Sequence, residues 1–354
     1  MNISFSSLNR CDYYIFVWSL YQFQGLLYPA GLIGQGLQAL LIVWALYEGG
    51  VYILPNKNNP PLLKATSILL LMYCIYGVIL MMDNQTGRQS PHTYLQSYLS
   101  SFLPVFLFYK YLKEGYLSED RIRNYIWLFL AVSVWVYFKY EQEALEKLRQ
   151  RGSSREEITN NAGYTFLALI PITFFFYKKT ILQYSLLCFI LLFIVMAMKR
   201  GPILIGGLCF VWTLFLNIKA AETKKQRCIA IIWGAIIVLA SIAYVSYQLN
   251  NSDYFNQRIE STKEGNMSHR DVLYSGAVDL IVNDNSITHL LIGRGAWATY
   301  KLLGNFAHQD WLELAVCNGL VGITIFVNFC ILFLLAVRQR IIELPIPIHT
   351  AFLM

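Results

Sequence analysis

Long apolar runs alternate with short charged segments along most of the chain. Ten of these runs are close to the roughly 17–25 residues that cross a bilayer. They comprise residues 13–29, 31–54, 62–82, 94–112, 125–140, 162–177, 180–198, 203–218, 228–247 and 311–337. Because lipid offers the backbone no hydrogen-bond partners, each run is predicted to be a helix. The pattern therefore predicts an all-α integral membrane protein with about ten transmembrane helices.

Two longer polar segments interrupt this pattern. The front half of residues 141–161 is rich in Glu, Lys and Arg, which predicts a short solvated helix before a Gly-Ser break. In the second segment, Ser268 and Asp271 resemble a capping box, and apolar residues at helical spacing predict an amphipathic helix over 268–282. The expected organisation is helices in 1–247, one large extracytoplasmic loop over 248–310, and a last span with its tail in 311–354.

Composition agrees with a membrane protein. The chain is 56% hydrophobic and 14% charged, whereas a soluble domain carries about 25% charged residues. The formal net charge is +7, but the basic residues are scattered at the ends of apolar runs, which disfavours nucleic-acid binding. The seven cysteines form no C-x-x-C pair and lie mostly inside apolar runs, so they are predicted to be small buried side chains.

The basic residues of the short loops predict the orientation. With a cytoplasmic N-terminus, the short inside loops hold most of the Lys and Arg, as cytoplasmic loops usually do. The short outside loops then hold only Arg88, Lys199 and Arg200. Both termini are therefore predicted to be cytoplasmic, and residues 248–310 are predicted to face the outside.

Cysteine labelling of intact cells tests this orientation. After replacement of the seven native cysteines, Thr262→Cys is expected to react with a membrane-impermeant maleimide because it lies in the outer loop. Thr223→Cys is expected to react only after the membrane is permeabilised. Reaction at position 223 but not at position 262 in intact cells would contradict the orientation.

Charged side chains gather at the predicted outer face, while the middles of the runs lack the ionisable groups that ion-coupled carriers place there. Lys199 and Arg200 either snorkel to the interface or form a cationic site, where the planar Arg fork suits phosphate. Arg270, in S-H-R-D, either pairs with a nearby acid such as Asp271 or binds an anion. Both alternatives remain open at this point.

His308 is the candidate catalytic base, in the string A-H-Q-D-W where the last span begins. A helix start favours a neutral imidazole, which can accept a proton from a hydroxyl. The alternative is that His308 caps the helix. Trp297 and Trp311 flank this region and either stack on sugar rings or belong to the interfacial aromatic belt. His308, Asp310 and Glu313 complement the helix dipole more simply than they bind a metal, so no metal or cofactor is expected.

Residues 268–326 resemble the diagnostic region of the O-antigen ligase and O-antigen polymerase superfamily. The strings S-H-R-D, L-L-I-G-R-G, A-H-Q-D-W-L-E-L and G-L-V-G follow one another in the family's order. Upstream, N-N-A-G-Y-T-F-L-A-L-I-P is similar to the family's span after its first outer loop, and K-R-G-P-I-L stands where the family has S-R-G. The resemblance covers roughly residues 160–337.

The resemblance implies a metal-independent glycosyltransferase of the bacterial inner membrane with a C-type fold. Such an enzyme would polymerise undecaprenyl-pyrophosphate-linked repeat units of O-antigen or capsule on the outer, periplasmic face. The alternatives are a ligase that transfers the glycan to lipid A core and a non-enzymatic exporter of lipid-linked glycan. The implied partners are the carrier-linked donor, a glycan or lipid-core acceptor, membrane lipids, and chain-length regulator and flippase proteins, with no nucleic acid.

The resemblance also implies roles for individual residues. Arg200 and Arg270 would hold the pyrophosphate, and His308 would act as base or orient the acceptor. Two positions depart from the family: Gln309 replaces Asn, and Lys199 replaces Ser. An outer-loop Arg also belongs to the pattern, and Arg149, Arg151 and Arg155 are the candidates. The residues expected to bind substrate are Lys199, Arg151, Arg155, Gln309, Asp310 and Trp297.

Overall fold

The computed structural model describes residues 8–27, 31–53, 59–82, 91–151, 161–176, 179–197, 199–221, 223–251, 270–307 and 309–343. All of the regular secondary structure in these ranges is helical. The chain divides into two compact units, one drawn from residues 1–37, 115–259 and 337–354 and the other from 38–114 and 260–336. The three-part organisation expected from the sequence stays a prediction.

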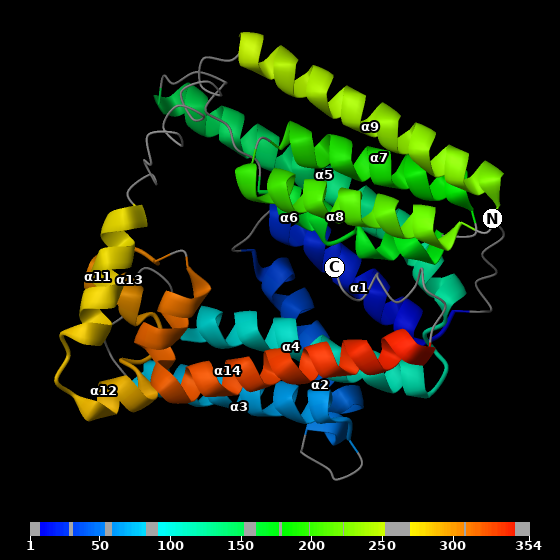
Figure 1. The fold of residues 1–354 in the computed structure, drawn as a ribbon. Coiled ribbons are helices and arrows are strands. Elements are labelled where there is room, and N and C mark those ends of the chain that lie inside the picture. The colour runs from blue at the N-terminus through cyan, green and yellow to red at the C-terminus, as the bar shows by residue number, and fades with distance from the viewer. Residues whose placement is uncertain are drawn as a thin grey trace. The chain divides into compact units, whose positions relative to one another are not determined.

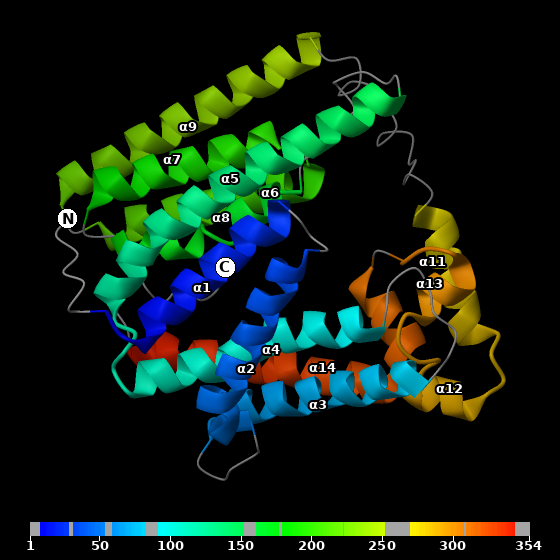
Figure 2. The same cartoon turned by 180° about the vertical axis from the view of Figure 1, so that it is seen from behind.

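The first unit gathers helices from the first half and the middle of the chain (Figure 1). They are α1 (Arg10–Leu27), α5 (Glu119–Arg151), α6 (Gly163–Leu167), the 3-10 helix η3 (Pro171–Phe176), α7 (Thr180–Met196), α8 (Arg200–Ala220) and α9 (Lys224–Asn251). Within the unit, α1 packs against α5, and α7 packs against α6, η3, α8 and α9. The long helices lie side by side in both views (Figures 1 and 2).

The second unit combines helices of the first third with most of the C-terminal third. They are α2 (Leu32–Ile53), which lies mostly in this unit, α3 (Pro61–Met82), α4 (Pro91–Lys113), α11 (Arg270–Val282), α12 (Ile287–Ile292), α13 (Ala298–Leu303) and α14 (Asp310–Glu343), most of which lies here. α3 packs against α4, and α11 packs against α13. Leu69 of α3 and Leu314 of α14 share a buried cluster, so α14 lies along this pair (Figure 2).

The described part of each apolar run is largely helical, and the prediction of an all-α chain with apolar helices is confirmed. Ten spans are not confirmed. Among the described residues, five helices are long and apolar enough to cross a membrane. They are Leu32–Ile53, Pro61–Met82, Gly201–Lys219, Lys224–Tyr244 and Asp310–Ala336. The segments Gly163–Phe176 and Thr180–Met196 are apolar but shorter, and α1 and α4 carry several polar residues among their apolar ones.

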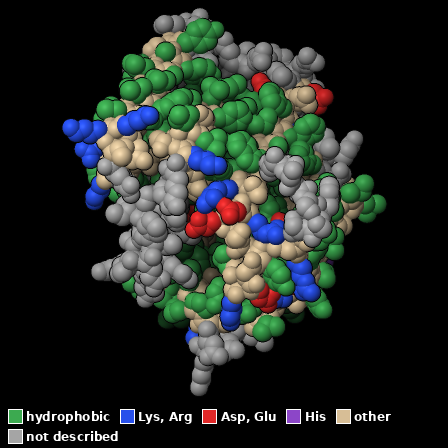
Figure 3. Space-filling model, turned by 90° about the vertical axis from the view of Figure 1, so that its right-hand side faces the viewer, with side chains coloured by type: hydrophobic (Ala, Val, Ile, Leu, Met, Phe, Trp, Pro, Cys, Tyr) green, Lys and Arg blue, Asp and Glu red, His purple; other side chains and the backbone are tan. Residues whose placement is uncertain are grey.

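Large apolar side chains remain exposed on these helices. Tyr47 is 84% exposed, Val51 is 75% exposed and Leu204 is 67% exposed. Hydrophobic side chains also cover much of the face in Figure 3, where Lys and Arg side chains lie in several groups. Apolar surface on this scale is typical of helices that face lipid.

The helix α5 extends further than the sequence pattern predicted. The run 125–140 and the charged residues after it form one helix of 33 residues, from Glu119 to Arg151, rather than a span followed by a separate short helix. Glu, Lys, Arg and Gln are good helix formers, so the change in polarity does not interrupt the helix. Such a helix is about 50 Å long, which exceeds the roughly 30 Å hydrocarbon core of a bilayer.

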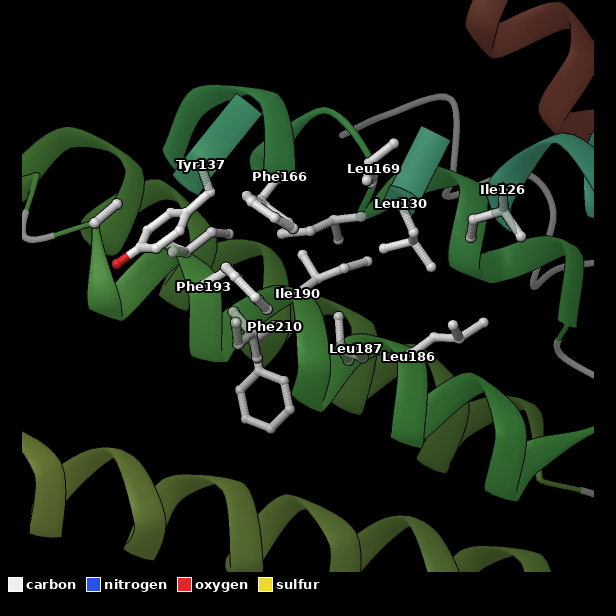
Figure 4. Packing of buried hydrophobic residues seen from close by; sticks show 14 of the residues in the cluster. Ile126, Leu130, Tyr137, Phe166, Leu169, Leu186, Leu187, Ile190, Phe193 and Phe210 are labelled. Atoms are coloured by element: carbon white, nitrogen blue, oxygen red, sulfur yellow. The ribbon is translucent and has the colours of Figure 1, made fainter. Parts of the chain in front are cut away.

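Aromatic and aliphatic side chains pack tightly in the core of the first unit (Figure 4). The rings of Phe166 and Phe193 are stacked with centroids 4.7 Å apart, and Tyr137 meets Phe193 edge-on at 5.0 Å. Leu187 and Ile190 of α7 are fully buried beside them. α7 is thus the central helix on which α5, α6 and α8 pack.

A capping box begins α1 and connects it to α5. The Oδ1 atom of Asn9 accepts hydrogen bonds from the backbone N–H groups of Cys11 and Asp12, and the Asp12 carboxylate accepts one from the Asn9 N–H at 2.8 Å. Asp12 also forms an ion pair with Arg121 and accepts a hydrogen bond from the Tyr125 hydroxyl at 2.5 Å. One carboxylate therefore serves both the helix start and the packing of α1 on α5.

This carboxylate should make stability depend on pH. Burial alone would raise the pKa of Asp12, but the hydrogen bonds from Tyr125 and Asn9 and the charge of Arg121 outweigh it, and the pKa is lowered from 3.8. A lowered folded-state pKa stabilises the protein above pH 3.8, and this contribution is lost as the pH falls through the folded-state value. The melting temperature of the wild type is therefore expected to fall more steeply below about pH 5 than that of Asp12→Asn.

The matched control for this prediction is Asp120→Asn. Asp120 is also paired with an arginine, Arg123, but its side chain is 83% exposed. Exposed pairs contribute little to stability. A melting-temperature profile of Asp12→Asn that ran parallel to the wild type from pH 6 to pH 3 would contradict the assignment.

Candidate functional site

A pocket of about 430 Å³ opens in the second unit beside the first turns of α14. Its lining comes from α3, α4, the segments before and after α13, and α14. The residues are Tyr73, Tyr94, Tyr98, Ala296, Trp297, Phe306, Asp310, Glu313, Leu314, Cys317, Asn318 and Phe326. We call this the α14 pocket. Its volume lies in the range of about 300–1,000 Å³ that is usual for small-molecule sites.

Aromatic rings form one wall of the α14 pocket. Tyr73 of α3 and Tyr98 of α4 are stacked with centroids 3.8 Å apart, and Tyr94 contacts Tyr98 at 4.7 Å. Trp297 meets Tyr94 edge-on at 5.5 Å. Two helices and one loop thereby present a continuous aromatic surface to the pocket.

The backbone of Trp297 is strained. Its φ of 59° and ψ of 23° lie in the left-handed region, which bulky residues rarely adopt. Hydrogen bonds around it stabilise this turn, because the Lys301 N–H donates to the Trp297 carbonyl at 2.9 Å and the Ala298 N–H donates to the Gly295 carbonyl at 3.3 Å. Such strain costs about 1–3 kcal/mol and is concentrated at functional sites.

Two polar groups in the pocket make no hydrogen bond of good geometry to a described residue. The Asn318 side chain is buried, with 4% exposed, and lies near the Tyr76 hydroxyl, but its Nδ2 atom makes no hydrogen bond of good geometry within the described ranges. Asp310 is exposed, and its carboxylate makes no hydrogen bond to another described residue. In contrast, the Glu313 carboxylate accepts hydrogen bonds from the Thr299 hydroxyl and the Ala307 N–H. Asn318 and Asp310 are thus the groups that can bind a ligand.

A break in α14 shapes the floor of this region. Gly319 has φ 62° and ψ −162°, which interrupts the helix and leaves the carbonyl groups before it without helical partners. The string G-R-G satisfies two of them: the Arg294 N–H donates to the Val316 carbonyl at 2.8 Å, and the Gly295 N–H donates to the Cys317 carbonyl at 3.0 Å. The backbone of this string therefore stabilises the helix end that precedes the break.

The side chain of Arg294 joins the short helices around it. Its Nη2 atom lies 2.6 Å from the Asp284 carboxylate, which also contacts His289 at 2.6 Å. The pKa of Asp284 is lowered, chiefly by the backbone N–H of Ser286 and then by His289 and Arg294. The cluster is an ion-pair network that orders residues 284–294, which follow α11.

Of the residues expected from the sequence to bind substrate, Trp297 and Asp310 line the same pocket. Gln309 has a different contact: its Oε1 atom accepts a hydrogen bond from the Leu312 N–H at 2.6 Å, so Gln309 is the N-cap of α14. His308 lies outside the described residues, between the fully buried Ala307 and this cap. Arg270 is the first residue of α11, and its side chain is not among those described.

The remaining candidates belong to the first unit. The Lys199 ammonium lies 5.7 Å from the centroid of the Tyr164 ring, a cation–π distance. Arg200 is the first residue of α8, and Arg151 is the last residue of α5. The side chains of both are not among those that the structure describes. Arg155 lies outside the described residues.

Sequence reasoning missed most of the pocket wall. Tyr94 and Tyr98 are spaced i, i+4, and this spacing places both side chains on one face of α4. That signal was present in the sequence. No local signal indicated that Tyr73 would join these two tyrosines from another helix, or that Asn318 would line the same pocket.

The described residues contain no group of three His, Cys, Asp or Glu side chains placed to hold a metal ion. The pocket instead presents aromatic rings, an amide and a carboxylate, which is a set that suits an uncharged polar ligand. No protein-family model, no curated protein and no solved structure matches this chain.

Proposed function

We propose that the protein is a membrane glycosyltransferase that polymerises oligosaccharide repeat units carried on undecaprenyl pyrophosphate. The observation that carries the proposal is the α14 pocket, where an aromatic wall faces a buried amide and an exposed carboxylate. Aromatic rings stack on the apolar faces of sugar rings, and amide and carboxylate groups bind sugar hydroxyls. The resemblance of residues 268–326 to the O-antigen ligase and polymerase superfamily supplies the class of donor.

The proposed reaction transfers a glycan to a hydroxyl. The acceptor oxygen attacks the anomeric carbon of the donor, and the bond from that carbon to the pyrophosphate oxygen breaks. The bonding electron pair leaves with undecaprenyl pyrophosphate, and the hydroxyl proton passes to His308. Negative charge develops on the leaving pyrophosphate, and guanidinium groups stabilise such charge strongly. This is the role that the resemblance assigns to Arg200 and Arg270.

The position of the α14 pocket agrees with a lipid-linked substrate. The pocket lies at the first turns of α14, one of the helices that are long and apolar enough to cross a membrane. A polyprenyl carrier remains in the bilayer, so its glycan is presented at the surface where such a helix begins. In the sequence, His308 stands two residues before Asp310, the first residue of this helix.

Purified protein in proteoliposomes with a synthetic undecaprenyl-pyrophosphate repeat unit tests the proposal. Products of two or more repeat units are expected, and empty liposomes are the control. Transfer to added lipid A core without chain extension would replace the polymerase with the alternative ligase. Movement of the intact substrate across the bilayer without any transfer would overturn the enzyme and favour the exporter.

A further inference from the structure

We infer that the α14 pocket binds a neutral sugar ring and that the amide of Asn318 selects it. This inference rests on the proposed function for its context, but it concerns binding rather than catalysis. It assigns to the pocket the sugar, and not the pyrophosphate, of a lipid-linked glycan.

The aromatic wall supplies the apolar part of this recognition. Tyr73, Tyr98, Tyr94 and Trp297 form a chain of ring contacts between 3.8 and 5.5 Å along one side of the pocket. One face of a pyranose exposes mainly C–H groups, which pack on such rings. The strained backbone of Trp297 holds its ring against Tyr94, so this surface is formed before the ligand arrives.

The two polar groups have opposite requirements. The Nδ2 atom of Asn318 is a buried donor that makes no hydrogen bond of good geometry within the described ranges, although the Tyr76 hydroxyl lies near it. The Asp310 carboxylate can only accept. A sugar hydroxyl both donates and accepts, so one ring of a glycan can accept from Asn318 while a hydroxyl further along the same glycan donates to Asp310. A buried donor without a good hydrogen bond is unfavourable, and a bound hydroxyl or carbonyl oxygen would remove this cost.

The two groups differ in depth, because Asp310 is exposed and Asn318 is buried. Asp310 is the first residue of α14, and Asn318 lies eight residues further along the same helix, just before the break at Gly319. This separation corresponds to roughly 12 Å of helix. Asp310 therefore lies near the entrance and Asn318 lies deep in the pocket, so a ligand must enter fully before it reaches the amide.

The charge of the pocket lining favours a neutral sugar over a phosphate. The described lining contains two carboxylates, Asp310 and Glu313, and no Lys, Arg or His. An anion placed between them would be repelled by both, and the repulsion is strong in a partly enclosed site. The pocket therefore disfavours both a pyrophosphate and a uronic acid.

Saturation-transfer-difference NMR on the purified full-length protein in detergent tests the inference. The probes are methyl glycosides of glucose, galactose and N-acetylglucosamine, with methyl glucuronide as the anionic probe. Signals from at least one neutral glycoside and a signal at least about tenfold weaker from the glucuronide are expected. Equal signals from the glucuronide and the neutral glycosides, or no signal from any neutral probe, would overturn it.

Three variants identify the site. Asn318→Leu removes the donor and is expected to weaken binding of the neutral glycoside about tenfold or more. Asn285→Leu makes the same change at an exposed position outside the pocket and should leave binding unchanged. Asp310→Asn changes an exposed residue and should raise binding of the glucuronide towards that of the neutral probe. Neutral-probe binding that survived Asn318→Leu, or a glucuronide signal that Asp310→Asn left unchanged, would place the sugar elsewhere.

Kinetics show whether the sugar in the pocket belongs to the donor or to the acceptor. With the acceptor saturating and then with the donor saturating, Asn318→Leu is expected to raise the KM of the substrate whose sugar occupies the pocket. A KM unchanged in both arms would overturn the inference. If the glycosides bind as expected but proteoliposomes show no transfer, the proposed function fails while the sugar site stands.

Discussion

His308→Ala is expected to lower the rate of glycan transfer by about 10²–10⁴-fold, the contribution that a positioned base typically makes. The acceptor hydroxyl is a poor nucleophile until its proton is removed, and the alanine side chain cannot accept it. Donor binding and membrane insertion should change little, because the proposed role begins only when acceptor and donor have met. Initial rates in proteoliposomes, at matched amounts of inserted protein, measure the effect.

His308→Asn separates a base from a structural residue. Asparagine keeps a polar side chain of similar reach but cannot take the proton, so its rate should be as low as that of alanine. The N-cap of α14 is already supplied by Gln309, whose Oε1 accepts from Leu312. Gln309→Ala should therefore lower thermal stability by about 0.5–2 kcal/mol. If His308→Asn turned over at the wild-type rate, the base would have to lie elsewhere.

Gly319→Ala is expected to destabilise the second unit by about 3 kcal/mol or more. At φ 62° and ψ −162° a side chain is strained whatever the space. There is also no space, because a Cβ atom would lie 2.5 Å from the Gly293 nitrogen and 2.6 Å from the Leu291 carbonyl oxygen. The loop must then move away from α14, which breaks the two backbone hydrogen bonds of the G-R-G string.

Gly50→Ala is the matched control. It makes the same substitution within α2, where a Cβ would meet no atom within 4 Å, so it should stabilise the helix by about 0.5–1 kcal/mol. Thermal unfolding in detergent, followed by tryptophan fluorescence, compares the two variants. Equal melting temperatures for Gly319→Ala and Gly50→Ala would show that the break in α14 is not a fixed feature of the fold.

The helices could be predicted from the sequence because apolar run length is a local property. The ends of the helices were less predictable where a helix continues past its apolar run or ends within it. The charged residues after Tyr140 leave the apolar run but continue α5 to Arg151, since they are good helix formers. In the run 162–177 the opposite occurs: it is apolar throughout, but it divides into α6 and the 3-10 helix that begins at Pro171.

The candidate site was predictable only in part. Trp297 and Asp310 could be predicted because they lie near or within the string A-H-Q-D-W, and both line the α14 pocket. The aromatic wall depends on Tyr73 and Tyr98 from two different helices, which no local pattern relates. The break at Gly319 was equally hidden, because it depends on a backbone contact with Gly293 far upstream in the chain.

The break in α14 has a consequence for how the protein responds to its bilayer. Most of the α14 residues that line the pocket lie within 310–318, and Phe326 is the exception. Residues 320–336 form an uninterrupted apolar helix of roughly 25 Å, close to the thickness of the hydrocarbon core. Such a segment matches a thinner bilayer by tilting, whereas a thicker bilayer must thin around it. Gly319 allows residues 320–336 to tilt while the backbone hydrogen bonds of the G-R-G string hold residues 310–318 in place. Acyl-chain length is then expected to affect insertion of the protein more than its affinity for sugar.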